Sequence, residues 1–147
     1  MLHHIKSIFQ KFSEPQKTDV ITCEVATAVL LAEVMCADHK LDEQEKKTII
    51  HILQEQFRLN EKQAVDLFSY AEEKTREVVS LQEYTSQINK LLNNMQRVKL
   101  VENIWRVIYA DGEIDKYEEH LIRRIAELLY VSHSDFIKTK HKILAEG

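Results

Sequence analysis

Apolar residues recur three and four positions apart along most of the chain, which is the period of a helix that buries one face. The pattern predicts seven helices. Four of them span Asp19–Cys36, Asp42–Phe57, Gln96–Ala110 and Asp115–Leu129, and the other three begin at Asn60, Ser80 and Ser132. The first helix is apolar around most of its surface, so we expect it at the centre of the fold. In the later helices an apolar stripe, which includes Leu91, Trp105 and Leu144, should face the core.

The helix starts and the composition agree with this pattern. Asn60 is followed three positions later by Gln63, and Ser132 by Asp135, which is the spacing of helix N-terminal capping pairs. The chain has only two Gly and one Pro, whereas strands joined by tight turns need more of both. The sequence therefore predicts an all-α fold, and its 147 residues suffice for one domain with its own core.

A short segment, residues 1–17, precedes this helical domain, which we place at residues 18–147. Its apolar residues Leu2, Ile5, Phe9 and Phe12 lie at helical spacing, and Pro15 ends the pattern. We expect an amphipathic helix that docks on the domain or frays from it. The alternative is an arm that makes peripheral membrane contact through residues 2–12 or binds a partner, although two Lys make only a weakly basic face.

The second half of the chain repeats the first. A shift of 73 residues pairs Val34, Ala37, Asp38, Leu41, Asp42, Glu45, Ile49 and Ile52 with Val107, Ala110, Asp111, Ile114, Asp115, Glu118, Ile122 and Ile125. A one-residue deletion then aligns Arg58 to Asn60 with Tyr130 to Ser132. Each unit has three helices and one acidic turn. Since one unit cannot bury its apolar faces alone, we expect a single bundle with an internal pseudo-two-fold repeat.

The charge balance and the cysteines narrow the partners and the compartment. The formal net charge is −4, without the basic excess of nucleic-acid-binding proteins, so we expect no nucleic-acid partner. Cys23 and Cys36 form no CxxC pair, which argues against a disulfide framework or a thiolate zinc site. No apolar run approaches the roughly 20 residues that span a bilayer, and the N-terminus lacks the apolar core of a signal peptide. We therefore expect a cytoplasmic protein.

Each copy of the repeat contains an acidic turn. In the second copy, Asp115 and Glu118 have capping-box spacing, and Gly112 suits a left-handed turn after a helix. Asp111, like its counterpart Asp38, follows the C-terminal end of a helix, where a negative charge is unfavourable by about 0.3–1 kcal/mol. Three partners would balance that charge: a bound cation, an Asx-type hydrogen bond to the next turn, or a salt bridge to Lys40, Lys46 or Arg106.

The acidic turns also suggest a metal site. The second turn matches the later part of an EF-hand loop, but Val107 and Tyr109 stand where the first ligands belong, which excludes a true EF-hand. A reduced site would use the carboxylates of Asp38, Asp42, Glu45, Asp111, Asp115 and Glu118. Their oxygen atoms suit a hard cation such as Ca²⁺ or Mg²⁺, provided that the two turns come together. Capping and local hydrogen bonds are the simpler interpretation.

The stretches "ADHKLDEQE" and "YADGEIDKYEEHLIRRIAELLYVS" resemble the TerB-like domain, an all-helical domain named for bacterial tellurite-resistance proteins. The resemblance covers about Asp19 to Leu144. It implies about seven helices and two acidic turns whose six carboxylates bind metal. His39 and Lys40 depart from the usual Gly and acid of the first turn. No J-domain His-Pro-Asp motif follows, so the chain is similar to stand-alone members.

Together these features favour a non-catalytic module that binds a partner protein, in a stress or membrane-associated complex and under the control of a divalent cation. The alternative is a metal-dependent enzyme in which the six carboxylates converge in a pocket with an open coordination position. The sequence contains no Gly-rich phosphate loop, no HExxH motif and no Glu-x-x-His pair of a di-iron bundle.

Overall fold

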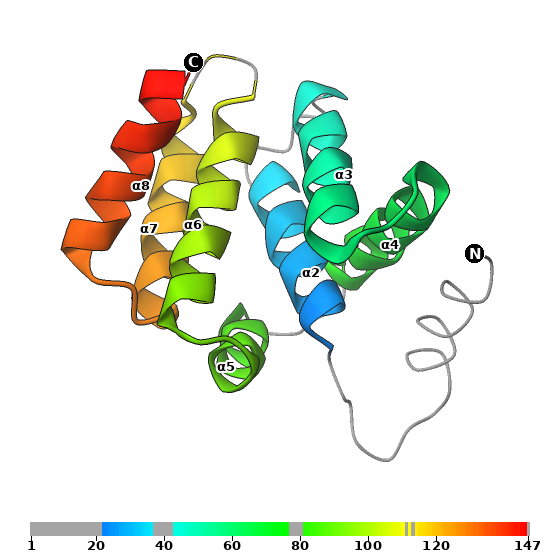
Figure 1. Cartoon of the computed structure of the whole chain (residues 1–147), viewed down its shortest axis with the longest axis horizontal. Coiled ribbons are helices and arrows are strands. Elements are labelled where there is room, and N and C mark those ends of the chain that lie inside the picture. Colours follow the sequence, from blue (N-terminus) through cyan, green and yellow to red (C-terminus); the bar gives the residue numbers. More distant parts are fainter. Residues whose placement is uncertain (1–21, 37–42, 77–80, 111, 113, 147) are drawn as a thin grey trace.

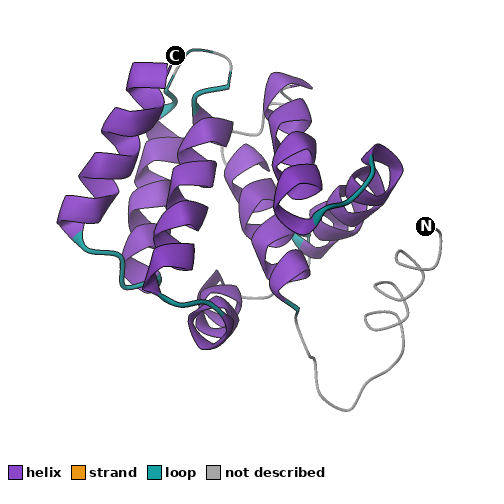
Figure 2. Cartoon of the chain, viewed as in Figure 1, coloured by secondary structure: helices purple, strands orange, loops and turns teal. Residues whose placement is uncertain are grey.

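The chain folds into a bundle of helices. The computed structural model describes residues 22–36, 43–76, 81–110, 112 and 114–146. This part of the chain contains seven α-helices and no strand, which confirms the predicted all-α class. The helices, arranged as in Figure 1 and Figure 2, are α2 (Cys23–Cys36), α3 (Glu43–Phe57), α4 (Glu61–Lys74), α5 (Leu81–Leu91), α6 (Asn94–Ile108), α7 (Lys116–Leu128) and α8 (His133–Glu146). Residues 1–17 lie outside the described residues, so the predicted domain boundary stays a prediction.

Helix α2 forms the centre of the bundle, as its sequence predicts. Ten of its 14 residues are buried. A helix with apolar side chains on nearly all of its faces is stable only when other elements cover it on all sides. It packs against α3, α4, α5 and α6, and to a smaller extent against α7. One continuous core around α2 therefore holds the helices of both halves of the chain together.

Helix α6 organises the second half. It packs most extensively against α8 and also contacts α2, α3 and α7. The ring of Trp105 is almost fully buried and lies 5.4 Å from the ring of Phe136 in α8, between centroids. The ammonium of Lys140 lies 5.5 Å from the centroid of the Trp105 ring, within the range of a cation–π contact. The predicted core position of Trp105 is confirmed, and this packing fixes α8 beside α6.

Helices α3 and α7 end in the same way. Arg58 and Tyr130 have positive φ angles of 54° and 56°. In each case the next amide donates to a carbonyl five positions back, from Leu59 to Gln54 and from Val131 to Ala126, both over 3.0 Å. This is a Schellman arrangement, in which glycine is the usual left-handed residue. The two ends occupy matching places in the predicted repeat, although the symmetry of the whole bundle stays a prediction.

Two residues that the apolar pattern assigned to the core are exposed, so that prediction was wrong for them. Leu91 is 50% exposed and Leu144 is 37% exposed. Leu91 is the last residue of α5 and is exposed at the helix end, whereas Ile88, one turn earlier on the same face, is buried. In α8 the neighbouring Ile143 is buried. Adjacent residues differ by about 100° around a helix, so packing against a neighbour decides which of two apolar residues is covered.

Candidate functional site

A groove with a volume of about 1240 Å³ lies between α3 and α6. Figure 1 shows these two helices running side by side in opposite directions. Four lining residues near the end of α3 and the start of α6 are apolar, namely Phe57, Leu92, Met95 and Val98, and we call them the apolar end. Phe57, Leu92 and Val98 are half-buried against the core, whereas Met95 is 80% exposed. Because methionine is flexible and polarisable, it adapts to the shape of an apolar ligand.

The start of α6 places Met95 in the groove. Asn93 caps the helix, since its side chain accepts a hydrogen bond from the amide of Gln96 over 2.9 Å. The side chain of Gln96 accepts one in return from the amide of Asn93, also over 2.9 Å. This capping box starts α6 two residues earlier than the sequence predicted, at Asn94, and stabilises its first turn.

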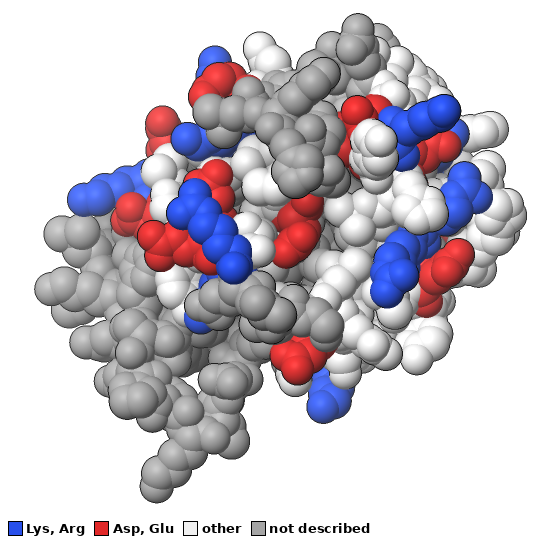
Figure 3. Space-filling model, turned by 180° about the vertical axis from the view of Figure 1, so that it is seen from behind, with Lys and Arg blue, Asp and Glu red and all other residues white. Residues whose placement is uncertain are grey.

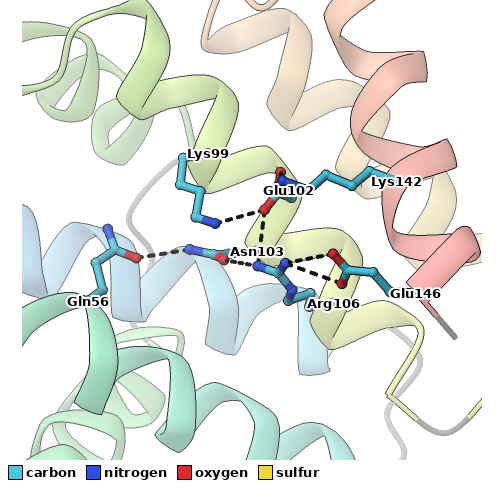
Figure 4. Close-up of polar contacts among 7 residues, drawn as sticks. All are labelled: Gln56, Lys99, Glu102, Asn103, Arg106, Lys142 and Glu146. Carbon is cyan, nitrogen blue, oxygen red and sulfur yellow. Dashed lines mark hydrogen bonds and ion pairs between the residues drawn. The ribbon is translucent and has the colours of Figure 1, made fainter.

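A buried carboxylate on α6 lies at the centre of a cluster of charges that we call the Glu102 cluster. Glu102 is only 6% exposed. Its Oε2 lies 2.8 Å from Lys99 Nζ and 3.1 Å from Arg106 Nη1, and its Oε1 lies 3.1 Å from Lys142 Nζ in α8. Arg106 Nη2 also pairs with Glu146 of α8 at 3.3 Å. Figure 4 shows these side chains converging from the two helices.

The surroundings of Glu102 hold its carboxyl group ionised. Burial by itself raises the pKa of Glu102, because the charged form loses hydration. Hydrogen bonds from Lys99 and Lys142, and the positive charges of Lys99 and Arg106, outweigh that effect. The pKa of Glu102 therefore lies below its ordinary value of 4.5. The resulting anion pairs with three cations at once.

A further polar contact connects this cluster to α3. Asn103, which is buried, donates from Nδ2 to Oε1 of Gln56 over 2.9 Å and accepts from Arg106 Nη1 over 3.2 Å. Gln56, Lys99, Glu102, Asn103 and Arg106 all line the groove. The groove therefore combines an apolar end with a chain of polar contacts that runs from α3 through α6 to α8 (Figure 4).

Sequence reasoning did not find the Glu102 cluster. A local signal existed, because Glu102 and Asn103 interrupt the apolar residues of a predicted core helix, and Lys99 and Arg106 lie on the same face as Glu102. No local pattern indicated that Lys142 and Glu146 join the cluster, because they come from a helix about 40 positions further along the chain.

The six predicted metal ligands are only partly placed by the structure. Asp38, Asp42 and Asp111 lie outside the described residues. Glu45 and Glu118 occupy the first turns of α3 and α7, where they are buried to 2% and 3% exposure. Asp115 caps α7, since its Oδ1 accepts from the amides of Tyr117 at 2.7 Å and Glu118 at 3.3 Å. The capping role of Asp115 is confirmed, and the metal assignment stays a prediction.

The described helices on either side of the two acidic turns end or begin at the same end of the bundle. Helices α2 and α6 run towards that end, and α3 and α7 run back from it (Figure 1). Gly112 has the left-handed φ of 83° that its place after α6 predicts. Within the described residues no three or more His, Cys, Asp or Glu side chains are grouped so that they could hold a metal ion.

The face opposite to the view of Figure 1 carries charges of both signs. Figure 3 shows Lys and Arg side chains interspersed with Asp and Glu on that face, in the part that the structure describes. None of the helices described is long and apolar enough to cross a membrane.

The fold and the groove define a small, all-helical, single-domain protein with one strongly apolar central helix. The chain belongs to the TerB family, because the family model described as "Tellurite resistance protein TerB" matches residues 24–141. The resemblance inferred from the acidic turns is thereby confirmed.

A solved structure of a protein of unknown function from Porphyromonas gingivalis W83 has a similar fold. Its TM-score is 0.60 at 15% sequence identity, over 88% of this chain and 96% of that chain. At this identity the likeness concerns the fold alone. No curated protein matches the sequence.

Proposed function

We propose that this protein is a non-catalytic binding module that accepts an amphipathic helix of a partner protein in the α3–α6 groove. The observation that carries the proposal is the exposure of Met95, 80%, beside the half-buried Phe57, Leu92 and Val98 at the apolar end. Amphipathic helices dock in such grooves through apolar residues spaced three, four and seven positions apart.

The charges beside the apolar end favour a partner with acidic residues next to its apolar stripe. Three cations, Lys99, Arg106 and Lys142, face two carboxylates, Glu102 and Glu146, so the cluster has an excess of one positive charge. Glu55 and Asp135 also line the groove, so the acidic residues of the partner are expected beside the cluster and not along the whole groove. Lys99 and Lys142 are about half exposed, which leaves them able to donate to a ligand. A carboxylate of the partner helix would neutralise that excess and set the direction of binding.

A selection of displayed peptides tests this proposal. A library of helices with an apolar stripe and randomised flanks is selected on the wild-type protein, and the affinities of the selected peptides are measured by fluorescence anisotropy. We expect peptides with acidic flanks to be enriched and Met95→Glu to weaken their binding at least about tenfold, since it places a charge at the apolar end. Tyr117→Glu, at an exposed position outside the groove lining, is the matched control. Equal binding by Met95→Glu would contradict the proposal.

We propose in addition that a divalent cation, Ca²⁺ or Mg²⁺, binds at the acidic turns and controls the module. Glu45 and Glu118 support this, because they are buried in the first turns of α3 and α7, two helices that begin at the same end of the bundle. The test is calorimetric titration of Ca²⁺, Mg²⁺, Mn²⁺ and Zn²⁺ into the wild type, Asp111→Asn and Asp115→Asn. Asparagine caps helices as well as aspartate does, so Asp115→Asn removes a ligand charge and keeps the cap. If neither substitution changed the heat of binding, cation binding at the second acidic turn would be excluded. The hypothesis of a metal-dependent enzyme that uses both acidic turns would then be excluded as well.

The proposed setting is the cytoplasm, in a stress or membrane-associated complex. The family description, which names tellurite resistance, supports a stress role. Fractionation of cells that produce the full chain tests this placement, and recovery outside the cytoplasmic and membrane-associated fractions would contradict it.

A further inference from the structure

The α3–α6 groove has a candidate occupant within the chain itself. We propose that the amphipathic segment of residues 2–12 docks in cis on the apolar end of the groove and leaves when a partner helix binds. The inference uses the same groove as the proposed function and adds a means of regulation to it.

The chain enters the described domain at the groove. Cys23, the first residue of α2, lines the groove together with Phe57 and Met95. The connection of ten residues between Phe12 and Cys23 can extend over about 33–36 Å. Residues 2–12 as a helix would be about 16 Å long, whereas α6 with its 15 residues is about 22 Å long. The segment can therefore lie along α6 without strain in the connection.

The apolar residues of the segment match the apolar end. Leu2, Ile5, Phe9 and Phe12 follow one another at intervals of three, four and three, which places them on one face of a helix. This is the anchor spacing of helices that dock in grooves. The groove offers an exposed Met95 and the half-buried rings and side chains around it, so docking would cover apolar surface on both sides.

The charges of the segment make this docking displaceable. Residues 1–12 contain Lys6 and Lys11 and no Asp or Glu, so they supply no carboxylate to the Glu102 cluster. A partner helix with acidic flanks makes that additional contact. The short connection raises the effective concentration of the segment to about the millimolar range, so even a weak contact would be populated in the absence of a partner.

Oxidative footprinting of the full-length protein tests the docking. Hydroxyl radicals oxidise exposed Met95, and mass spectrometry measures the rate in the wild type, Phe9→Asp and Ser7→Asp. Phe9 lies on the apolar stripe, whereas Ser7 lies on the opposite face of the same helix and controls for the added charge. We expect Met95 to be oxidised several-fold faster in Phe9→Asp than in the other two proteins. Met35, which is buried in the core, should react equally slowly in all three and so reports an intact fold.

Three outcomes would overturn the inference. The first is equal oxidation of Met95 in the wild type and in Phe9→Asp. The second is protection that disappears on about hundredfold dilution, because an intramolecular contact is independent of concentration. The third combines two results: Met95 is unprotected in the wild type, and the wild type binds phosphatidylcholine–phosphatidylglycerol vesicles whereas Phe9→Asp does not. These results would show that the segment is a membrane anchor. None of these measurements uses a partner peptide, so failure here leaves the peptide selection intact.

Discussion

Asn103 of α6 donates a hydrogen bond of 2.9 Å from its Nδ2 to Oε1 of Gln56 in α3. The two residues are 47 positions apart, and their contact joins the two walls of the groove. Because Asn103 also accepts from Arg106, the same side chain connects the groove walls to the Glu102 cluster. The spacing of α3 and α6 is therefore held by a partly buried polar contact as well as by the core.

Asn103→Ala should lower the free energy of unfolding by about 1–3 kcal/mol, because it removes two hydrogen bonds and leaves a buried gap. Gln56→Ala removes the same cross-helix bond from an exposed position and should cost less than about 1 kcal/mol. Urea denaturation followed by circular dichroism measures both values. Equal losses for the two variants would show that the burial of Asn103 is unimportant.

Glu102→Gln keeps the shape of the side chain and removes the charge that holds Lys99, Arg106 and Lys142. We expect a loss of about 1.5–3 kcal/mol in the free energy of unfolding, since hydrogen bonds to a charged group are lost at a buried site. Glu146→Gln, at a half-exposed position, is the matched control and should cost about 0–1 kcal/mol. Chemical denaturation compares them, and a larger loss for Glu146→Gln would contradict the central place of Glu102.

The stabilising effect of Glu102 should depend on pH. Its pKa is lower in the folded state than in the unfolded chain, so its contribution is complete above the ordinary value of 4.5 and is lost as the pH falls through the folded pKa. The difference in unfolding free energy between the wild type and Glu102→Gln should therefore be largest near neutral pH and shrink below about 4.5. Urea titrations across the acidic range measure it. A difference that grows on acidification would mean that the pKa of Glu102 is raised.

Tyr130→Gly should stabilise the protein by about 0.5–1 kcal/mol. A non-glycine residue with positive φ costs about 1–2 kcal/mol, part of which the greater unfolded-state entropy of glycine offsets. The Tyr130 side chain is largely exposed, so little packing is lost. Thermal unfolding measures the change. Glu127→Gly, within helix α7, is the control and should destabilise by about 1 kcal/mol; a loss at both positions would argue against strain at Tyr130.

Asp115→Ala should lower the free energy of unfolding by about 1 kcal/mol, because the amides of Tyr117 and Glu118 lose their acceptor. Asp115→Asn should be nearly neutral, since asparagine accepts the same bonds. The comparison is made by chemical denaturation in the presence of a chelator, so that cation binding does not contribute. Equal destabilisation by Ala and Asn would show that the charge, not the capping geometry, stabilises the turn.

Several parts of the structure were predictable because they depend on residues that are close in the chain. The apolar period located the seven described helices. The Asn60–Gln63 capping box, the cap at Asp115 and the left-handed Gly112 are confirmed for the same reason. Each of these features is a contact or a backbone angle within one turn, so the local sequence contains all of its partners.

The sequence by itself thus determined the helical class, the central position of α2 and the family resemblance carried by the acidic turns. Only the tertiary structure decided which side chains meet between helices. The Glu102 cluster needs Lys142 and Glu146 from α8, and the groove needs Gln56 of α3 beside Asn103. These partners are about 40 or more positions apart, and their approach follows from the packing of α3, α6 and α8, which no local pattern specifies.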